Sequence, residues 1–313
     1  MRVIVAKPRG FCAGVDRAIE IVEKALDMYG PPIYVRHAIV HNKRAVESLI
    51  AKGVVFVEEL EEIKDKDARV IFSAHGVSPA VLQEAGKMSL EVVDAVCPLV
   101  TKVHDEVKHY ADLGYTIVLI GHRNHVEVIG TSGEAPDKVV VVETVEEVEK
   151  LSVPDPGKIA YVTQTTLSVD DTRDIVNALK KRYPEVISPS KLDICYATQN
   201  RQDAVKELAK HSDIIFIMGS PESSNSNRLV EVAKTCGVDD AHLIEGADNL
   251  SKEMFRDDIV VGLSSGASTP ETVVLEVIDR LIQFGAKSVE QLEGKEEYTR
   301  FPFQDSLEFS KVQ

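Results

Sequence analysis

The sequence predicts an α/β protein with largely parallel sheets, in which three similar α/β repeats surround a pseudo-threefold axis and a central cavity. Three observations predict this fold class. Strand-like apolar runs alternate with amphipathic runs along the whole chain. Hydrophobic residues make up 44% of the chain but aromatic residues only 5%, which is typical of the aliphatic core of helix-covered parallel sheets. One order of strand, turn and helix also occurs three times, each time beginning at a cysteine.

Short aliphatic runs bounded by turn-forming residues mark the strands. We expect strands at residues 2–6, 33–37, 54–57, 69–72, 115–120, 139–142, 158–163, 213–218, 241–244 and 259–263. The amphipathic stretches between them predict helices, among others at residues 16–29, 100–113, 171–182, 204–211, 228–236 and 271–284. Strands that alternate with helices favour parallel pairing, since the helix provides the crossover.

The threefold recurrence sets the expected domain boundaries. From the cysteine of each repeat, a first polar turn follows after 29, 28 and 28 residues, and a second after 63, 68 and 73. We therefore expect α/β repeats at residues 1–95, 96–193 and 194–313, although the first strand could also pack with the third repeat. The alternative is the ordinary recurrence of strand, turn and helix in any α/β protein, but this would not place one cysteine in each repeat at matched positions.

Length and charge restrict the function. The 313 residues carry a formal net charge of −15, which argues against nonspecific nucleic-acid binding and leaves room for a small phosphate ligand bound by backbone N–H groups. The chain enters a strand at once, and its apolar runs are too short for a signal peptide or a membrane span, so we expect a cytoplasmic protein. Four cysteines in a reducing compartment indicate metal or catalytic work rather than disulfides.

Cys12, Cys97 and Cys195 each stand just before an expected helix, whose N-terminus favours the metal-binding thiolate. None belongs to a C-x-x-C pair, which argues against a zinc ribbon. Three thiolates that meet from three repeats suit an iron–sulfur cluster with one iron open to substrate. The alternative is three unrelated buried cysteines that pack as small hydrophobes. Cys236, at the end of an amphipathic helix, is interpreted as core packing.

The polar turns supply hydrogen-bond donors of modest size at strand ends. They are His41, His75, His125, Thr165, Thr166, Ser223, Ser224, Asn225 and Ser268. Helix N-termini that converge there would bind a phosphate. For any one Ser or Thr the alternative is plain helix capping. Glu127, two residues after His125, could relay protons beside a phosphate site and a metal centre, although a lone Glu is more often solvated surface.

Taken together, these motifs resemble the 4-hydroxy-3-methylbut-2-enyl diphosphate reductase family of the non-mevalonate isoprenoid route. The matching segments are residues 9–15 (RGFCAGV), 40–42 (VHN), 73–78 (SAHGVS), 94–98 (DAVCP), 121–122 (GH) with 125–127 (HVE), 163–168 (TQTTLS), 193–198 (DICYAT), 223–229 (SSNSNRL) and 266–268 (GAS). They extend from residue 9 to about residue 270. Val126 stands where the family often has Pro, and the polar tail from residue 293 onward matches no motif.

The resemblance implies a [4Fe–4S] cluster bound by Cys12, Cys97 and Cys195, with the substrate hydroxyl at the fourth iron. It implies that two electrons, from ferredoxin or flavodoxin, and protons remove this hydroxyl as water, giving isopentenyl diphosphate and dimethylallyl diphosphate. Glu127 matches the family's proton-delivery residue, with Thr165 close by. The diphosphate-binding set that it implies is His41, His75, His125, Ser223, Ser224, Asn225 and Ser268.

Two other classes of protein remain as alternatives. A sugar-phosphate isomerase or a nucleotide-binding α/β protein would explain the polar turns but not the register of the cysteines, and the chain has neither a Walker motif nor a G-x-G-x-x-G after a strand. A noncatalytic redox-sensing or zinc-binding protein would explain the cysteines but leave the polar turns without a role.

Overall fold

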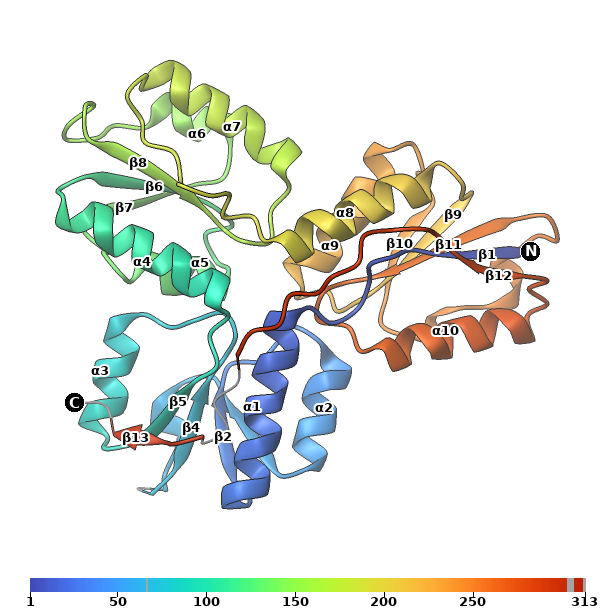
Figure 1. The fold of residues 1–313 in the computed structure, drawn as a ribbon, viewed down its shortest axis with the longest axis horizontal. Coiled ribbons are helices and arrows are strands. Elements are labelled where there is room, and N and C mark those ends of the chain that lie inside the picture. The colour runs from blue at the N-terminus through green and yellow to red at the C-terminus, as the bar shows by residue number, and fades with distance from the viewer. Residues whose placement is uncertain (66, 303–306, 312–313) are drawn as a thin grey trace. The chain divides into compact units, whose positions relative to one another are not determined.

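The structure is a computed structural model that describes residues 1–65, 67–302 and 307–311, and within these residues the strands form three sheets (Figure 1). Sheet A contains β1 (Arg2–Val5), β9 (Ile214–Met218), β10 (Ala241–Ile244), β11 (Val260–Ser265) and β12 (Val289–Gln291). Sheet B contains β2 (Ile33–Arg36), β3 (Val54–Val57), β4 (Arg69–Phe72), β5 (Glu91–Asp94) and β13 (Ser310–Lys311). Sheet C contains β6 (Thr116–Ile120), β7 (Val139–Val142) and β8 (Ile159–Thr163).

The strand orders are β10-β9-β11-β1-β12 in sheet A, β13-β5-β4-β2-β3 in sheet B and β7-β6-β8 in sheet C. Every pair among these strands is parallel except β5 with β13, which is antiparallel. The predicted α/β class with largely parallel sheets is therefore confirmed, and three sheets agree with three repeats. The first strand pairs with β11 and β12, in the register Val3 to Val261 and Val3 to Val289.

Helices connect the strands. They are α1 (Ala13–Tyr29), α2 (Lys43–Ala51), α3 (Pro79–Lys87), α4 (Pro98–Asp112), α5 (Val126–Ser132), α6 (Val145–Lys150), α7 (Val169–Arg182), α8 (Tyr196–Ala209), α9 (Ser224–Thr235) and α10 (Glu271–Gln283). Short 3-10 helices lie at Leu60–Glu62, Ala247–Asn249 and Lys252–Met254. None of the described helices is long and apolar enough to span a membrane.

The chain forms two compact units, here called unit I and unit II. Unit I comprises Met1–Val15, His41–Ser48 and Tyr196–Arg300, and contains sheet A. Unit II comprises Asp16–Val40, Leu49–Cys195 and, where described, Phe301–Gln313, and contains sheets B and C. The boundaries of the three sequence repeats stay a prediction, as does their arrangement around a pseudo-threefold axis.

Sheet A is covered on both faces, because alternate residues of each strand point to opposite sides. On one face, Val3, Phe216 and Leu263 pack with the apolar side of α10. On the other face, Ile4 and Ile215 pack with α8 and α9. The strands β9 and β11 are therefore almost continuously apolar and buried, as central parallel strands are.

Sheet C has the same layered organisation. Val118 and Ile120 pack with α6 and α7, whereas Ile117 and Leu119 pack with α4 and α5. On sheet B, Val70 and Phe72 form an apolar cluster with Ala85 of α3. Each sheet thus holds the C-terminal ends of its strands rigidly, and the polar turns follow from these ends.

Several details differ from the sequence-based expectations; for example, α9 begins at Ser224 rather than at residue 228. Helix α8 begins at Tyr196, whereas the sequence predicted a helix only from residue 204. The first turns of α8 bury polar side chains, including Thr198, Arg201 and Gln202, so the amphipathic pattern does not mark them. Cys236 is exposed, so its interpretation as core packing was wrong. It lies just after the last residue of α9, Thr235, where the buried face of the helix has ended.

Candidate active site

The three candidate cluster ligands stand at equivalent places in the fold, immediately before a helix. Cys97 is the N-cap of α4, Cys12 directly precedes α1, and Cys195 directly precedes α8. All three are half-buried, and all four cysteines of the chain are thiols rather than disulfides. The partial positive charge at a helix N-terminus stabilises a thiolate, so each position suits a sulfur ligand.

A backbone hydrogen bond ties each of these cysteines to the polar turn at the end of a strand. The N–H of Cys97 donates to the carbonyl of Ala74 (3.0 Å) and that of Cys195 to Thr165 (3.0 Å). In the same way, the N–H of Cys12 donates to the carbonyl of Ala267 (3.1 Å). In each case the acceptor belongs to the second polar turn of another sequence repeat. The same backbone hydrogen bond therefore holds each of the three cysteine loops.

The buried carboxylate of Asp193 also holds the segment just before Cys195. The backbone N–H of Thr163 donates to Oδ2 of Asp193 (2.8 Å), and Nζ of Lys102 lies 2.6 Å from its Oδ1. Burial raises the pKa of Asp193 to about 6, although Lys102 acts in the opposite direction. The end of β8 and the segment before Cys195 are thereby fixed to each other.

The donor set has the chemistry of an iron–sulfur site, although no three His, Cys, Asp or Glu side chains in the described part of the chain form a ready set of metal ligands. Cys97 and Cys195 belong to unit II and Cys12 to unit I. Three thiols at helix N-termini, in loops fixed by equivalent hydrogen bonds, fit a cluster that requires thiolates. The approach of the three sulfurs to one another stays a prediction.

Glu127 and Thr165 form a buried pair in unit II. The backbone N–H of Thr165 donates to Oε1 of Glu127 (2.7 Å), and its hydroxyl lies 3.0 Å from Oε2. Glu127 is only 3% exposed and Thr165 only 6%. Glu127 is therefore not solvated surface, which was the alternative interpretation of a lone glutamate.

Burial raises the pKa of Glu127, because a carboxylate loses its hydration inside the protein. The two hydrogen bonds from Thr165 lower it, and His104 also lowers it, but burial is the larger effect. A carboxyl group with a raised pKa keeps its proton at higher pH and can donate it, as a general acid must.

His75 and His125 lie next to each other in unit II. Their ring centroids are 5.9 Å apart in an edge-on arrangement. His125 is the N-cap of α5, and its Nδ1 accepts a hydrogen bond from the backbone N–H of Glu127 (3.2 Å), while Nδ1 of His75 lies 3.2 Å from Oγ of Ser73. Thr166, the next residue after Thr165, accepts a hydrogen bond from Nε2 of Gln164 (2.9 Å).

The remaining predicted diphosphate ligands gather in unit I around the turn at residues 266–268. The hydroxyl of Ser268 donates to the carbonyl of His41 (2.9 Å). The N–H of Ala267 donates to Oδ1 of Asn225 (2.9 Å). Because the carbonyl of the same Ala267 binds the N–H of Cys12, this turn links the loops of Cys12, Asn225 and His41.

The beginning of α9 combines a capping serine with the positive end of the helix dipole. Ser223 is the N-cap, and its Oγ accepts from the N–H of Ser226 (3.2 Å), so this residue caps the helix, while its role as a ligand stays a prediction. Ser224, the first residue of the helix, is half-buried, and Asn225 is 5% exposed. Gly266 packs against Ser226 so closely that a Cβ on it would lie 2.1 Å from Oγ of Ser226.

His104, a buried histidine near Glu127, was not predicted as a site residue from the sequence. Nδ1 of His104 lies 2.8 Å from Oε1 of Glu134, and both side chains are only 8% exposed. His104 also contacts Gly76, where a Cβ would lie 2.9 Å from its Cε1. The sequence could have indicated the burial of His104, because it falls in the buried stripe of α4 together with Val100, Val103 and Val107.

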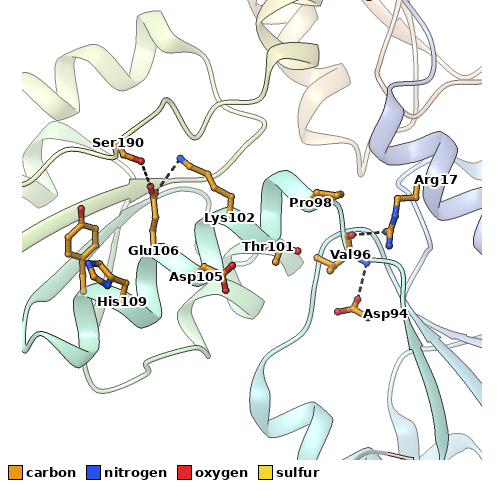
Figure 2. Close-up of a pocket in the computed structure, with 11 residues that line it drawn as sticks. Arg17, Asp94, Val96, Pro98, Thr101, Lys102, Asp105, Glu106, His109 and Ser190 are labelled. Carbon is orange, nitrogen blue, oxygen red and sulfur yellow. Dashed lines mark hydrogen bonds and ion pairs between the residues drawn. The ribbon is translucent and has the colours of Figure 1, made fainter. Parts of the chain in front are cut away.

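Unit II also has an open cleft of about 860 Å³, lined mainly by α4 and the end of β5 (Figure 2). Arg17 donates to the carbonyl of Val96 (3.0 Å), and Glu106 lies between Lys102 (3.3 Å) and the hydroxyl of Ser190 (3.1 Å). The charges in its wall thus partly neutralise one another, and the cleft contains none of the predicted ligands.

Comparison with known proteins agrees with the sequence motifs. The family model described as LytB protein matches residues 3–282. A relative from Azoarcus sp. (strain BH72), named 4-hydroxy-3-methylbut-2-enyl diphosphate reductase, is 54% identical over 306 residues, which are 98% of this chain and 97% of the relative. The protein of the same name from Bordetella pertussis (strain Tohama I) is 54% identical over 97% of this chain and 93% of its own length.

Solved structures give the same result. That of E-1-hydroxy-2-methyl-but-2-enyl-4-diphosphate reductase from Plasmodium falciparum has a TM-score of 0.90 and 41% identity, with 95% of this chain and 93% of that chain covered. A structure of (E)-4-hydroxy-3-methyl-but-2-enyl diphosphate reductase has a TM-score of 0.64 and 35% identity, with 90% and 100% covered. The chain therefore belongs to the LytB protein family, the family of the 4-hydroxy-3-methylbut-2-enyl diphosphate reductases.

Proposed function

We propose that this protein reduces 4-hydroxy-3-methylbut-2-enyl diphosphate to isopentenyl diphosphate and dimethylallyl diphosphate. Two electrons and two protons are consumed, the C–O bond of the substrate hydroxyl breaks, and water leaves. The names of its relatives and the likeness over nearly the whole chain support this reaction. A ferredoxin or a flavodoxin is the proposed electron donor.

Cys12, Cys97 and Cys195 are the proposed ligands of a [4Fe–4S] cluster. When bound, the cluster would supply the two electrons one at a time and a Lewis-acidic iron that three cysteines leave open. The protein residues around it fix the three thiolates through the backbone hydrogen bonds of the cysteine loops. The three cysteines themselves are half-buried.

The proposed diphosphate ligands are neutral donors and histidines rather than lysines or arginines. They are His41, His75, His125, Thr166, Ser223, Ser224, Asn225 and Ser268. Helix α9 adds the positive end of its dipole to this set. Binding energy from the diphosphate, which is remote from the reacting C–O bond, serves to orient the hydroxyl-bearing end of the substrate.

Glu127 is the proposed proton donor, with Thr165 as its relay. In the structure the Thr165 hydroxyl donates to Oε2 of Glu127, 3.0 Å away. Once Oε2 is protonated, it can donate its proton to Oγ of Thr165 instead, while the hydroxyl proton of Thr165 turns to the substrate. The backbone N–H of Thr165 holds Oε1 meanwhile, so the carboxyl group keeps its orientation.

A single observation carries the proposal. Thr165 binds both oxygens of a buried carboxyl group with its N–H and its hydroxyl, and its carbonyl receives the N–H of Cys195. One residue thus joins a proton source to a candidate metal ligand. Neither a zinc-binding protein nor a redox sensor requires this arrangement.

The test is to purify the protein without oxygen and to measure its iron content. We expect a brown protein with about four irons per chain, and a visible spectrum that changes when the allylic diphosphate alcohol is added. Bound zinc, or a colourless protein that does not respond to the alcohol, would contradict the proposal.

The role of Glu127 is tested with Glu127→Gln, which keeps the shape of the side chain but removes the transferable proton. We expect kcat to fall by about 10² to 10⁴ and KM to change little, since the residue acts on the reaction more than on binding. Steady-state kinetics with a chemical reductant measures both constants. An unchanged kcat would exclude the proton role.

A further inference from the structure

Arg201, on α8 in unit I, is among the largest side chains that the described core buries completely. Its Nε and Nη2 both donate to the carbonyl of Gly10 (3.1 and 2.7 Å), and Nη2 also donates to the carbonyl of Phe11 (3.2 Å). Its Nη1 donates to the carbonyl of Ala197 in its own helix (2.9 Å). The planar guanidinium therefore binds the two residues just before Cys12, a geometry that a lysine ammonium cannot reproduce.

The carboxylate that neutralises Arg201 comes from the polar tail, which matched no motif. Nη1 of Arg201 lies 3.1 and 3.2 Å from the two carboxylate oxygens of Glu297, whose side chain is 15% exposed. Nδ2 of Asn200 also donates to Glu297 (2.9 Å). A buried guanidinium without such a partner is strongly destabilising, so the position of Arg201 depends on the tail.

The tail reaches Arg201 by running along the N-terminal segment, as Figure 1 shows for the red chain beside the blue one. The N–H of Leu292 donates to the carbonyl of Val5 (2.9 Å). At Gly294 a Cβ would lie 1.9 Å from the carbonyl oxygen of Lys7, so only glycine allows this approach. The tail is thus in close contact with the same segment that ends at Cys12.

The loop before Cys12 is held from its other side by sheet A. Gly10 has a φ of +69°, a conformation that favours glycine, and its N–H donates to Oγ of Ser265 (2.9 Å). Ser265 at the end of β11 thus binds the N–H of Gly10, and Arg201 binds its carbonyl. Sheet A thus holds the loop before Cys12 through Ser265, and Arg201, paired with Glu297, holds it through the carbonyl of Gly10.

We propose that Glu297, acting through Arg201, is a positioning residue for Cys12, so that the tail is part of the machinery that binds the metal cluster. The proposal rests on the proposed function for its metal, but not for its effect on the thiol. Partners behind a metal ligand fix its orientation, and their loss weakens metal binding by about 10- to 100-fold.

The first experiment needs no metal. The iron-free full-length chain is alkylated with iodoacetamide under native conditions, and the rate at each cysteine is measured by peptide mass spectrometry. In Glu297→Gln we expect Cys12 to react several-fold faster than in the wild type, with the rates at Cys97, Cys195 and Cys236 unchanged. Equal acceleration at all four thiols would indicate general loosening of the fold and would overturn the proposal.

Asp203→Asn is the matched control. Asp203 lies on the same helix and forms an ion pair with another tail residue, Lys295 (3.1 Å), but this pair is exposed and does not contact the Cys12 loop. The control should leave the rate at Cys12 unchanged. A rate that rises as much as in Glu297→Gln would mean that any tail contact suffices. Arg201→Lys, which keeps the charge but loses the planar fork, should repeat the selective effect and serves if Glu297→Gln does not fold.

The second experiment uses the protein purified without oxygen. We expect Glu297→Gln to release iron to a chelator about 10-fold faster than the wild type and Asp203→Asn to match the wild type. Equal release by all three proteins would contradict the proposal. A wild type without iron would refute the proposed function instead, while the alkylation rates would still decide whether Glu297 positions Cys12.

Discussion

At the scale of single residues, Glu127 shows how burial sets the chemistry of a carboxyl group. The side chain is almost completely enclosed, and its partners are the N–H and hydroxyl of Thr165 rather than a lysine or an arginine. Hydrogen bonds from neutral donors compensate only part of the lost hydration, so the pKa of Glu127 is raised. This cost in stability is consistent with a residue that is retained for proton transfer.

The raised pKa predicts a pH-dependent stability. A carboxyl group that binds its proton more tightly in the folded than in the unfolded state contributes stability fully below the unfolded pKa, about 4.3, and loses it as the pH rises through the folded pKa. Glu127→Gln cannot titrate. The free energy of unfolding of the wild type relative to this variant should therefore fall as the pH rises above about 4.3, as measured by urea unfolding at a series of pH values.

Glu147→Gln is the control for this prediction. The N–H of Glu143 donates to the Glu147 carboxylate and lowers its pKa, so Glu147 is ionised in both states over most of this range. The difference in the free energy of unfolding between Glu147→Gln and the wild type should stay nearly constant. The same constancy for Glu127→Gln would show that burial does not control this carboxyl group.

The proposed proton relay through Thr165 predicts a difference between two substitutions. Thr165→Val keeps the shape of the side chain, the N–H to Glu127 and the carbonyl to Cys195, but removes the hydroxyl, so kcat should fall by about 10²-fold or more. Thr165→Ser retains the hydroxyl, so its kcat should fall much less. Steady-state assays compare the two variants, and equal values of kcat would argue that the hydroxyl carries no proton.

At the scale of elements, helices α4 and α5 and the turn after β4 form a compact group behind the Glu127 site. His104 of α4, held by Glu134, packs against Gly76, and a Cβ at Gly130 of α5 would lie 3.3 Å from the carbonyl oxygen of Gly76. Gly76 follows His75, and Gly130 lies in the helix that begins beside His125 and Glu127. The close approach at Gly76 therefore helps to set the distance between the two histidines.

Gly76→Ala tests this contact. The residue has a φ of +78°, and a Cβ would lie 2.9 Å from His104, so backbone strain and a steric clash should together lower the free energy of unfolding by about 2–4 kcal/mol. Gly30→Ala is the control, because Gly30 has a similar φ of +73° but no atom within 4 Å of the added Cβ. It should cost only about 1–2 kcal/mol in urea unfolding. Equal costs would mean that the contact with His104 contributes nothing.

At the scale of the whole molecule, the sequence predicted what depends on short-range pattern. The predicted strands at residues 54–57, 69–72 and 139–142 agree with the observed strands. Short aliphatic runs bounded by turn residues rarely form anything but a strand. The strands β5, β12 and β13 were not predicted. The three residues of β12 are all exposed, so no burial pattern marks them.

The candidate site was predictable only in part. The cysteines before helices and the polar turns follow from local motifs, and Cys97 is indeed an N-cap followed by Pro98. The pairing of Arg201 with Glu297 joins residues 96 positions apart, one on a helix with a weak pattern and one in a tail without any. No local signal specifies such a contact, because it depends on which segments pack together in the fold.

The division of the chain also has a consequence for its synthesis. The polypeptide passes between unit I and unit II at five points, so neither unit corresponds to one continuous fragment. Strand β1 is translated long before its partners β11 and β12, which begin at Val260 and Val289. Such long-range pairing forms slowly, so sheet A should be complete only after Gln291 has been translated, and the proposed cluster would be inserted later still.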